Sequence, residues 1–218
     1  MNKNAVVLWT GGKDSTLALH EAVAMGYQVK SLVTFAPEKE RFLAHPLKFI
    51  KRQAEALRLP HRTIRVRPPF REGYEKAIQG LSRTAGTLVT GDISEVDGHP
   101  NWIRECSRKS GVGVLTPLWK RGRVGILREL LSFGFSVVFS CVKKPWFTRD
   151  WVGQTLDERR LRRLIQMHKE TGLDVCGENG EYHSLVTDGP LFHEAVQITH
   201  RSTRTEGRLM YLVIKKMK

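Results

Sequence analysis

The sequence predicts an α/β fold: an open, mostly parallel sheet with helices on both faces, followed by a smaller C-terminal α+β domain. Short apolar runs alternate with helical patterns through the first two thirds of the chain, as in parallel sheets covered on both faces. A glycine pair directly follows the first apolar run. Beyond about residue 144 the alternation stops, and a basic helix and a hairpin follow. We therefore expect one domain over residues 1–144 and another over residues 145–218.

Each element of the first domain has its own residue pattern. Apolar runs predict strands, and apolar residues three or four apart predict helices. Gly26 and Gly134 close two helices, because glycine readily adopts the left-handed conformation at a helix end. The run from Phe135 to Val142 is almost wholly apolar, so we expect it near the centre of the sheet. The expected strands cover residues 5–9, 29–35, 61–66, 87–90 and 135–142, and the expected helices cover residues 14–25, 45–59, 74–83, 102–109 and 126–133.

The second domain begins where two lysines and a proline interrupt the pattern, at residues 143–145. Thr155 and Glu158 form a capping box that opens a basic helix reaching about residue 169. A glycine-rich acidic stretch follows, and the chain ends in a hairpin. Its strands are expected over residues 196–200 and 209–214, around a turn near Gly207.

The composition is that of a folded protein with excess positive charge. The chain has 218 residues, is 40% hydrophobic, and carries a formal net charge of +14. Such a charge is suited to RNA or a ribonucleoprotein as a partner. A generally basic proteome is the alternative, and it is favoured because no aromatic-interleaved RNA motif accompanies the charge. Three scattered cysteines without a CxxC pair favour a reducing compartment. The first apolar run is too short for a signal or a membrane span, so we expect a cytoplasmic protein without membrane contact.

A phosphate-binding loop is predicted between the first strand and the first helix, over Thr10, Gly11, Gly12, Lys13, Asp14 and Ser15. Adjacent glycines let the backbone approach a ligand closely, and the N–H groups at a helix start favour an anion. Lys13 adds a positive charge and Ser15 a hydroxyl donor. The pattern is neither Walker A nor GxGxxG, and a tight strand-to-helix turn is the alternative interpretation.

Carboxylates and an imidazole are the other candidate groups. Glu178, Glu181 and His183 lie in a loop that could bind Mg²⁺, hold an ammonium ion, or act as acid and base; a solvated acidic loop is the alternative. Asp92 ends the fourth strand and could hold Mg²⁺ or a ribose, or cap a turn. The candidate metal ligands are Asp14, Asp92 and Glu178.

Two motifs resemble known families. Residues 10–15 resemble the SGGxDS loop of the PP-loop, or N-type, ATP pyrophosphatases, with Thr10 in place of the first serine. Residues 176–192, which contain CGENGEYHS and DGPLF, resemble the signature of the diphthine–ammonia ligase family, also called the ATP-binding domain 4 family. Ser184 stands where threonine is commonest. The resemblance extends from residue 5 to about residue 192.

The resemblance implies a fold like that of the adenine nucleotide alpha hydrolases, with ATP and Mg²⁺ as cofactors. It implies that a carboxylate attacks the α-phosphorus of ATP, that pyrophosphate leaves, and that ammonia then displaces AMP from the acyl-adenylate. In that family the carboxylate belongs to diphthine, a modified histidine of elongation factor 2. Lys13 would then clamp the phosphates. Glu178, Glu181 and His183 would serve the chemistry, with Glu181 taking a proton from ammonium.

Other functions stay open at this point. A PP-loop enzyme that modifies tRNA would suit the basic charge, although sulfur transfer usually relies on catalytic cysteines and no CxxC pair is present. A nucleotide-binding regulator without turnover is a further alternative. If the source is bacterial, we expect a related ligase that acts on another carboxylate.

Overall fold

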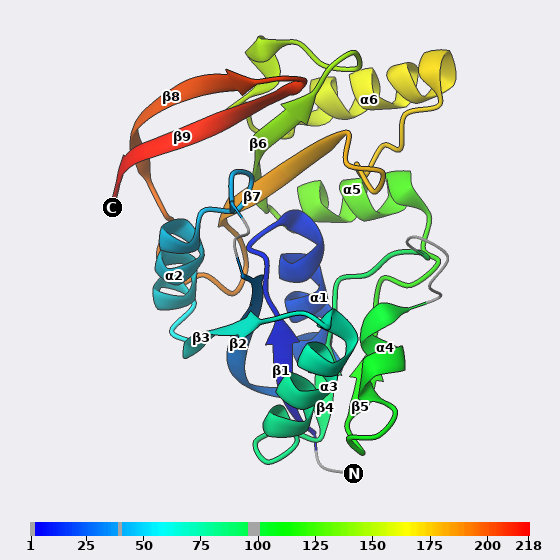
Figure 1. The fold of residues 1–218 in the computed structure, drawn as a ribbon. Helices are drawn as coiled ribbons and strands as arrows, with labels where there is room; N and C mark the ends of the chain where they lie inside the picture. The colour runs from blue at the N-terminus through cyan, green and yellow to red at the C-terminus, as the bar shows by residue number, and fades with distance from the viewer. Residues whose placement is uncertain (1–2, 39–40, 96–100) are drawn as a thin grey trace. The chain divides into compact units, whose positions relative to one another are not determined.

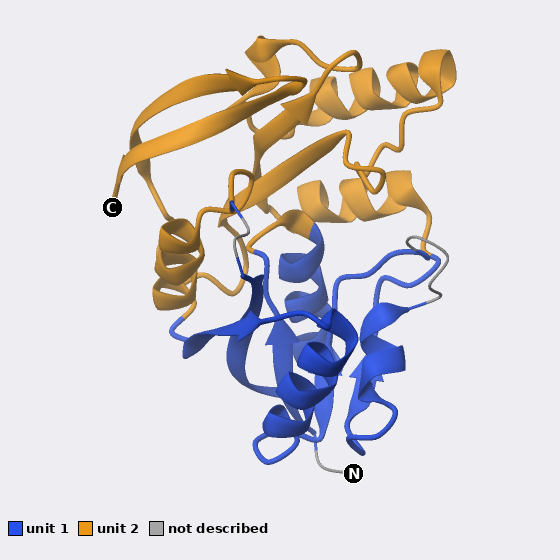
Figure 2. Cartoon of the chain, in the orientation of Figure 1, with its two compact units in different colours: residues 1–10, 14–41, 58–120 blue, residues 11–13, 42–57, 121–218 orange. Residues whose placement is uncertain are grey.

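The computed structural model describes residues 3–38, 41–95 and 101–218. The chain forms two compact units, and each unit contains segments that are distant in sequence (Figure 2). Unit 1 comprises residues 1–10, 14–41 and 58–120, and unit 2 comprises residues 11–13, 42–57 and 121–218.

Unit 1 is built on a five-stranded sheet whose strands are all parallel (Figure 1). The strand order is β3-β2-β1-β4-β5. Strands β2 and β3 follow β1 on one side of the sheet, and β5 follows β4 on the other side. The direction in which the chain adds strands therefore reverses between the neighbouring strands β1 and β4. Ligands in open α/β sheets bind beyond the carboxyl ends of the strands at such a reversal. The strands are β1 (Asn4–Leu8), β2 (Gln28–Pro37), β3 (His61–Val66), β4 (Thr87–Val89) and β5 (Gly113–Leu115).

Helices cover this sheet. On one face, α3 (Phe70–Leu81) and α4 (Trp102–Ser107) bury apolar side chains against Val6, Val33 and Leu88 of the strands. Helix α1 (Lys13–Ala24) joins β1 to β2, and a right-handed crossover places it on the opposite face. The expected parallel sheet with helices on both faces is confirmed.

Unit 2 is built on a four-stranded antiparallel sheet with the order β7-β6-β9-β8. Its strands are β6 (Ser136–Lys143), β7 (Tyr182–Asp188), β8 (Ile198–Glu206) and β9 (Leu209–Met217). The unit also holds α2 (Leu47–Ala56), α5 (Arg123–Ser132), a short 3-10 helix η1 (Arg149–Trp151) and α6 (Glu158–Thr171). Phe49 and Ala56 of α2 pack against Leu185 of β7, and Val196 completes this small core. The second, α+β part of the fold is thus confirmed.

The apolar run at residues 135–142 was expected at the centre of the parallel sheet, and this expectation was wrong. The run forms β6, which lies between β7 and β9 in the antiparallel sheet (Figure 1). Aromatic rings pack on this strand, since Phe139 contacts both Trp151 and Tyr182. A central strand that is buried throughout reads as a continuous apolar run whatever the direction of its neighbours. Residues 121–144 lie in compact unit 2, and the domain division after Lys144 stays a prediction from the sequence.

Smaller differences concern element ends and two strands that the sequence did not indicate. The strands β5 and β7 were not expected. Helix α3 begins four residues earlier than the pattern suggested. Helix α6 is capped by Asp157 in place of the predicted Thr155, because the Asp157 carboxylate accepts the Arg160 N–H at 2.7 Å. The C-terminal hairpin is confirmed, with a first strand that extends to Glu206.

Candidate functional site

The predicted phosphate loop connects β1 to α1. In unit 1, the Ser15 hydroxyl folds back toward the start of the loop and lies 3.1 Å from the Thr10 hydroxyl and 3.4 Å from the Thr10 N. The loop after β4 approaches the same helix end closely. A Cβ at Gly91 would lie 2.7 Å from the backbone N of Ser15 and 2.5 Å from the carbonyl carbon of Asp14, so only glycine fits there.

The middle of the loop, residues 11–13, belongs to unit 2 and forms hydrogen bonds with β7. The Val186 N–H donates to the Gly11 carbonyl at 3.0 Å, and the Lys13 N–H donates to the Ser184 hydroxyl at 3.2 Å. The side-chain amide of Gln53 also donates to the Gly11 carbonyl, at 2.8 Å. Strand β7, which lies within the second sequence motif, therefore holds residues 11–13 in place.

The Lys13 side chain is buried, with 4% of its surface exposed. Its ammonium lies 5.3 Å from the centre of the Tyr182 ring, within the range of a cation–π contact. The Tyr182 hydroxyl donates to the Val175 carbonyl at 2.7 Å, which fixes the ring. A desolvated ammonium at a helix start attracts an anion much more strongly than a surface lysine does.

Asp92 follows β4 at the reversal point of the sheet. Its N–H donates to the Thr90 hydroxyl at 3.1 Å, and its carboxylate accepts the Asn101 side-chain amide at 2.8 Å. Asn101 also caps α4, since its side-chain oxygen accepts the Arg104 N–H at 2.8 Å. We did not single out Asn101 from the sequence, although an asparagine directly before a predicted helix is a signal for a cap.

Asp14 and Asp92 are the carboxylates of unit 1 that could hold a magnesium ion at the end of the sheet. Asp14 lies in the first turn of α1, and the close approach of Gly91 brings the loop that carries Asp92 beside it. Both residues are partly exposed, although Oδ1 of Asp14 is buried. Proteins usually hold Mg²⁺ through one or two carboxylates together with substrate phosphates. Among the residues that the structure describes, no cluster of three or more histidine, cysteine or acidic side chains forms a candidate metal site.

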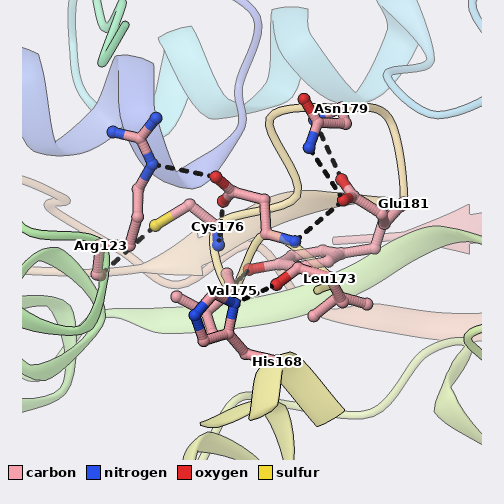
Figure 3. Close-up of polar contacts among 9 residues, drawn as sticks. Arg123, His168, Leu173, Val175, Cys176, Asn179 and Glu181 are labelled. Carbon is pink, nitrogen blue, oxygen red and sulfur yellow. Dashed lines mark hydrogen bonds and ion pairs between the residues drawn. The ribbon is translucent and has the colours of Figure 1, made fainter. Parts of the chain in front are cut away.

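The loop of the second motif is compact, and Glu181 is buried within it (Figure 3). Its carboxylate accepts the Asp174 N–H at 2.9 Å, the Asn179 N–H at 2.9 Å and the Asn179 side-chain amide at 3.2 Å. Only 2% of Glu181 is exposed. The sequence suggested that both carboxylates of the loop face a ligand. In the structure, the Glu181 carboxylate instead accepts hydrogen bonds from the loop's own N–H groups.

Asp174 joins this loop to Arg123 of α5. Its carboxylate accepts the Arg123 guanidinium at 3.1 Å and the Cys176 N–H at 2.7 Å. The Cys176 thiol in turn lies 3.4 Å from the Arg123 carbonyl. His168 of α6 contacts the Leu173 carbonyl through Nδ1 at 2.7 Å, so both neighbouring helices hold the loop.

Glu178 and His183 are the more accessible members of the motif. Glu178 is partly exposed, and His183 is exposed. Alternation along β7 places His183 on the strand face opposite Tyr182 and Ser184. The His183 ring meets the His45 ring edge to face, with centroids 5.4 Å apart. Unit 2 therefore brings His183 together with His45, and Lys13 together with Tyr182 and Ser184.

In unit 1, His61 supports the end of β1 through Thr34, although no sequence pattern indicated this histidine. The Thr34 hydroxyl donates to the Trp9 carbonyl at 2.7 Å and lies 2.8 Å from Nε2 of His61. Because the hydroxyl proton is already used, His61 must donate through Nε2. Burial lowers the pKa of His61, which favours its neutral form.

Two family models match nearly the whole chain. The model described as the diphthamide synthase N-terminal domain matches residues 3–114, and the diphthamide synthase C-terminal domain matches residues 123–218. No helix in the described part of the chain has the length and apolar character needed to span a membrane.

Curated relatives carry a common name. A human protein named diphthine–ammonia ligase is 27% identical over 87% of this chain and 80% of its own length. A zebrafish protein of the same name is 26% identical over 91% of this chain and 87% of its own length. The Schizosaccharomyces pombe protein of that name is 24% identical over 95% of this chain, which spans only 38% of that relative's length.

A solved structure, described as a predicted subunit of tRNA methyltransferase from Methanocaldococcus jannaschii, covers 86% of this chain and 99% of its own, with 18% identity and a TM-score of 0.49. The family assignment is independent of that distant likeness and depends on the two family models, which together account for both units and both sequence motifs. The chain belongs to the diphthamide synthase family.

Proposed function

We propose that this chain is an ATP-dependent ligase that forms an amide from a carboxylate and ammonia, with diphthine on elongation factor 2 as the carboxylate. The names of its relatives support the substrate. The observation that carries the ATP-dependent chemistry is the buried Lys13 ammonium at the start of α1, in a loop held by β7. A desolvated cation beside helix N–H groups is suited to a triphosphate.

The proposed reaction has two steps. A carboxylate oxygen attacks the α-phosphorus of ATP, the bond to the β-phosphate oxygen breaks, and pyrophosphate leaves. Ammonia then attacks the acyl carbon, AMP leaves, and the nitrogen loses a proton. Lys13 and the loop N–H groups would bind the β- and γ-phosphates and stabilise the charge that develops on pyrophosphate. Mg²⁺, held by Asp14 or Asp92 together with the phosphates, would neutralise part of the same charge.

The ammonia step needs a group that binds ammonium and takes its proton. We assign this role to Glu178 or His183, which are accessible to a ligand. Glu181 would act differently from the role expected from the sequence. Its three hydrogen bonds from the loop suit it to maintain the loop conformation that presents Glu178.

The placement of the cysteines disfavours the alternative of sulfur transfer to tRNA. Cys106, Cys141 and Cys176 are all buried. Burial raises the pKa of the Cys106 thiol, and it raises the pKa of the Cys141 thiol to about 11. A thiol must be deprotonated and accessible to act as a nucleophile. The ligase chemistry makes no such demand on these residues.

We propose that the acceptor protein docks on the exposed face of α6. Arg160 is engaged with Asp157 and Gln154 in the first turn of the helix. Four other basic residues of the helix are exposed, namely Arg159, Arg162, Arg163 and Lys169. Of these, Arg163 pairs with Glu170 at 3.9 Å. Such a face attracts an acidic protein surface or a phosphate backbone through long-range electrostatics.

Product analysis tests the proposal. The chain is incubated with ATP, Mg²⁺, ammonium and elongation factor 2 that carries diphthine, and the nucleotide products are separated. We expect AMP and pyrophosphate in equal amounts, dependent on the acceptor, and amide formation on the factor by mass spectrometry. ADP as the main product would contradict the ligase assignment. AMP formation with a different carboxylate, and none with diphthine, would confine the error to the substrate.

The docking part is tested in the same assay by varying the salt. Because screening weakens exposed charges, the KM for the acceptor should rise steeply between low and physiological salt, while the KM for ATP changes little. An acceptor KM that is insensitive to salt would contradict docking through α6.

A further inference from the structure

We propose that Gln53 is a positioning residue that orients the phosphate loop for ATP. This inference deepens the proposed function and depends on it, because it assumes that residues 11–13 bind the triphosphate. Gln53 lies in α2, 42 residues from Gly11, and is completely buried. It belongs to neither sequence motif.

Both side-chain N–H groups of Gln53 are used on backbone carbonyls. Nε2 donates to the Gly11 carbonyl at 2.8 Å and to the Val186 carbonyl at 2.7 Å. The reversed amide would place an oxygen against two carbonyl oxygens, so this orientation is fixed. Oε1 is buried, and no residue in the described part of the chain forms a hydrogen bond with it. A buried oxygen without a hydrogen bond costs free energy, so packing alone would favour an apolar side chain at this position. The two donated hydrogen bonds therefore explain why a glutamine stands here.

These bonds determine how the loop faces a ligand. The Gly11 carbonyl accepts from Gln53 on one side and from the Val186 N–H on the other. Within a planar trans peptide the C=O and N–H groups point in opposite directions. The carbonyl that is held toward Gln53 and β7 therefore directs the Gly12 N–H away from them, toward the opposite side of the loop. Gln53 thus sets the direction of a backbone donor in the phosphate loop.

The glycine at position 11 fits the same arrangement. Its φ of +74° lies in the left-handed region, which strains a residue with a side chain. A Cβ at Gly11 would also overlap Oε1 of Gln53. The close approach of the loop backbone to the Gln53 amide therefore requires glycine for two separate reasons.

Helix α2 has other anchors, so the loss of the Gln53 amide should leave unit 2 folded. Phe49 and Ala56 pack against Leu185 of β7. Arg52 forms an ion pair with Glu194 at 2.9 Å, and the Ala56 carbonyl accepts the His193 N–H at 2.8 Å.

The test compares Gln53→Met, which keeps the length and removes both donors, with Lys51→Ala, an exposed control on the same helix. ATP binding is measured by calorimetry, and turnover by AMP release. For Gln53→Met we expect the ATP affinity to fall about tenfold and the KM for ATP to rise by about the same factor, while the KM for ammonium stays unchanged. Lys51→Ala should match the wild type. Wild-type ATP affinity in Gln53→Met would overturn the inference, whatever its thermal stability.

A second variant gives a readout that packing alone would not move. In Gln53→Glu, an ionised carboxylate would face two carbonyls, so at a pH above the pKa of the introduced carboxyl the ATP affinity should fall further than in Gln53→Met. Burial raises that pKa, and the protonated carboxyl can again donate to one carbonyl, so the affinity should recover relative to wild type as the pH is lowered from about 9.5 to about 6. The absence of this recovery would contradict the role of the donated bonds.

The inference and the proposed function can fail separately. If the wild-type chain does not bind ATP, the proposed function is wrong. Hydrogen exchange then tests Gln53 without nucleotide, because loss of its bonds should raise exchange in the peptide that covers residues 11–13 in Gln53→Met and leave Lys51→Ala unchanged. Equal exchange in both variants would overturn the positioning role.

Discussion

The two motif loops satisfy their polar groups in opposite ways. Residues 11–13 of the phosphate loop have partners that are distant in sequence: Ser184, which accepts the Lys13 N–H, is 171 residues away, and Gln53 is 42 residues from Gly11. In the second loop, Glu181 accepts from Asp174 and Asn179, which lie seven and two residues before it. Residues 11–13 of the first loop therefore depend on the tertiary structure of unit 2. The second loop depends mainly on its own sequence, with links to α5 through Asp174 and Cys176 and a link to α6 through the Leu173 carbonyl.

This difference separates two uses of a buried charge. Lys13 is buried against an aromatic ring, a contact that leaves its charge suited to a phosphate ligand. Glu181 is buried among N–H donors of its own loop, an arrangement in which the charge stabilises the protein's conformation. Removing the first charge should therefore affect catalysis, and removing the second should affect stability.

The largest effect is expected for Lys13→Ala. Loss of an electrostatic contact to the phosphates should lower the rate of AMP release by about 10²- to 10³-fold. Thermal unfolding is measured beside it, to separate a loss of activity from a loss of the fold, and should remain close to that of the wild type. Lys48→Ala, at an exposed position of α2, is the matched control. Full activity in Lys13→Ala would show that the two loops do not differ in this way.

The next effect is expected for Glu181→Ala. Three N–H donors would lose their acceptor, which should lower the free energy of unfolding by about 3 kcal/mol in urea titrations. Glu178→Gln, in the same loop, should change stability by less than about 0.5 kcal/mol, because the residue is partly exposed. If Glu181→Gln keeps wild-type stability and loses only the ammonia-dependent step, then Glu181 acts on the substrate, as first expected from the sequence.

The smallest effect is expected for Ser184→Ala. The Lys13 N–H would lose its acceptor, at a cost of about 1 kcal/mol, and the KM for ATP should rise by about threefold to fivefold. Ser184→Thr retains the hydroxyl and should behave as the wild type in steady-state kinetics. An effect of Ser184→Ala on the KM for ammonium alone would place this serine with the second loop and not with the first.

Much of the fold could be read from the sequence because its signals are local. The apolar runs predicted four of the five strands of the parallel sheet, all but β5, and the glycine loop followed β1 as expected. The hairpin at the C-terminus was likewise indicated by its turn. The strand β6 was recognised, but its sheet was not, because a uniformly apolar run reports burial on both faces and does not report which strands lie beside it.

The sequence by itself determined which residues form the two motifs, and through them the family. Only the tertiary structure decided what each motif residue contacts. Gln53 lies in an ordinary amphipathic helix, and no local pattern connects it to Gly11 or Val186. Glu178 and Glu181 look equivalent in sequence, yet one is partly exposed and the other is buried with three donors. The physical reason is that helix and strand periodicity depends on neighbours along the chain, whereas the partners of a buried polar group depend on which distant segments pack against it.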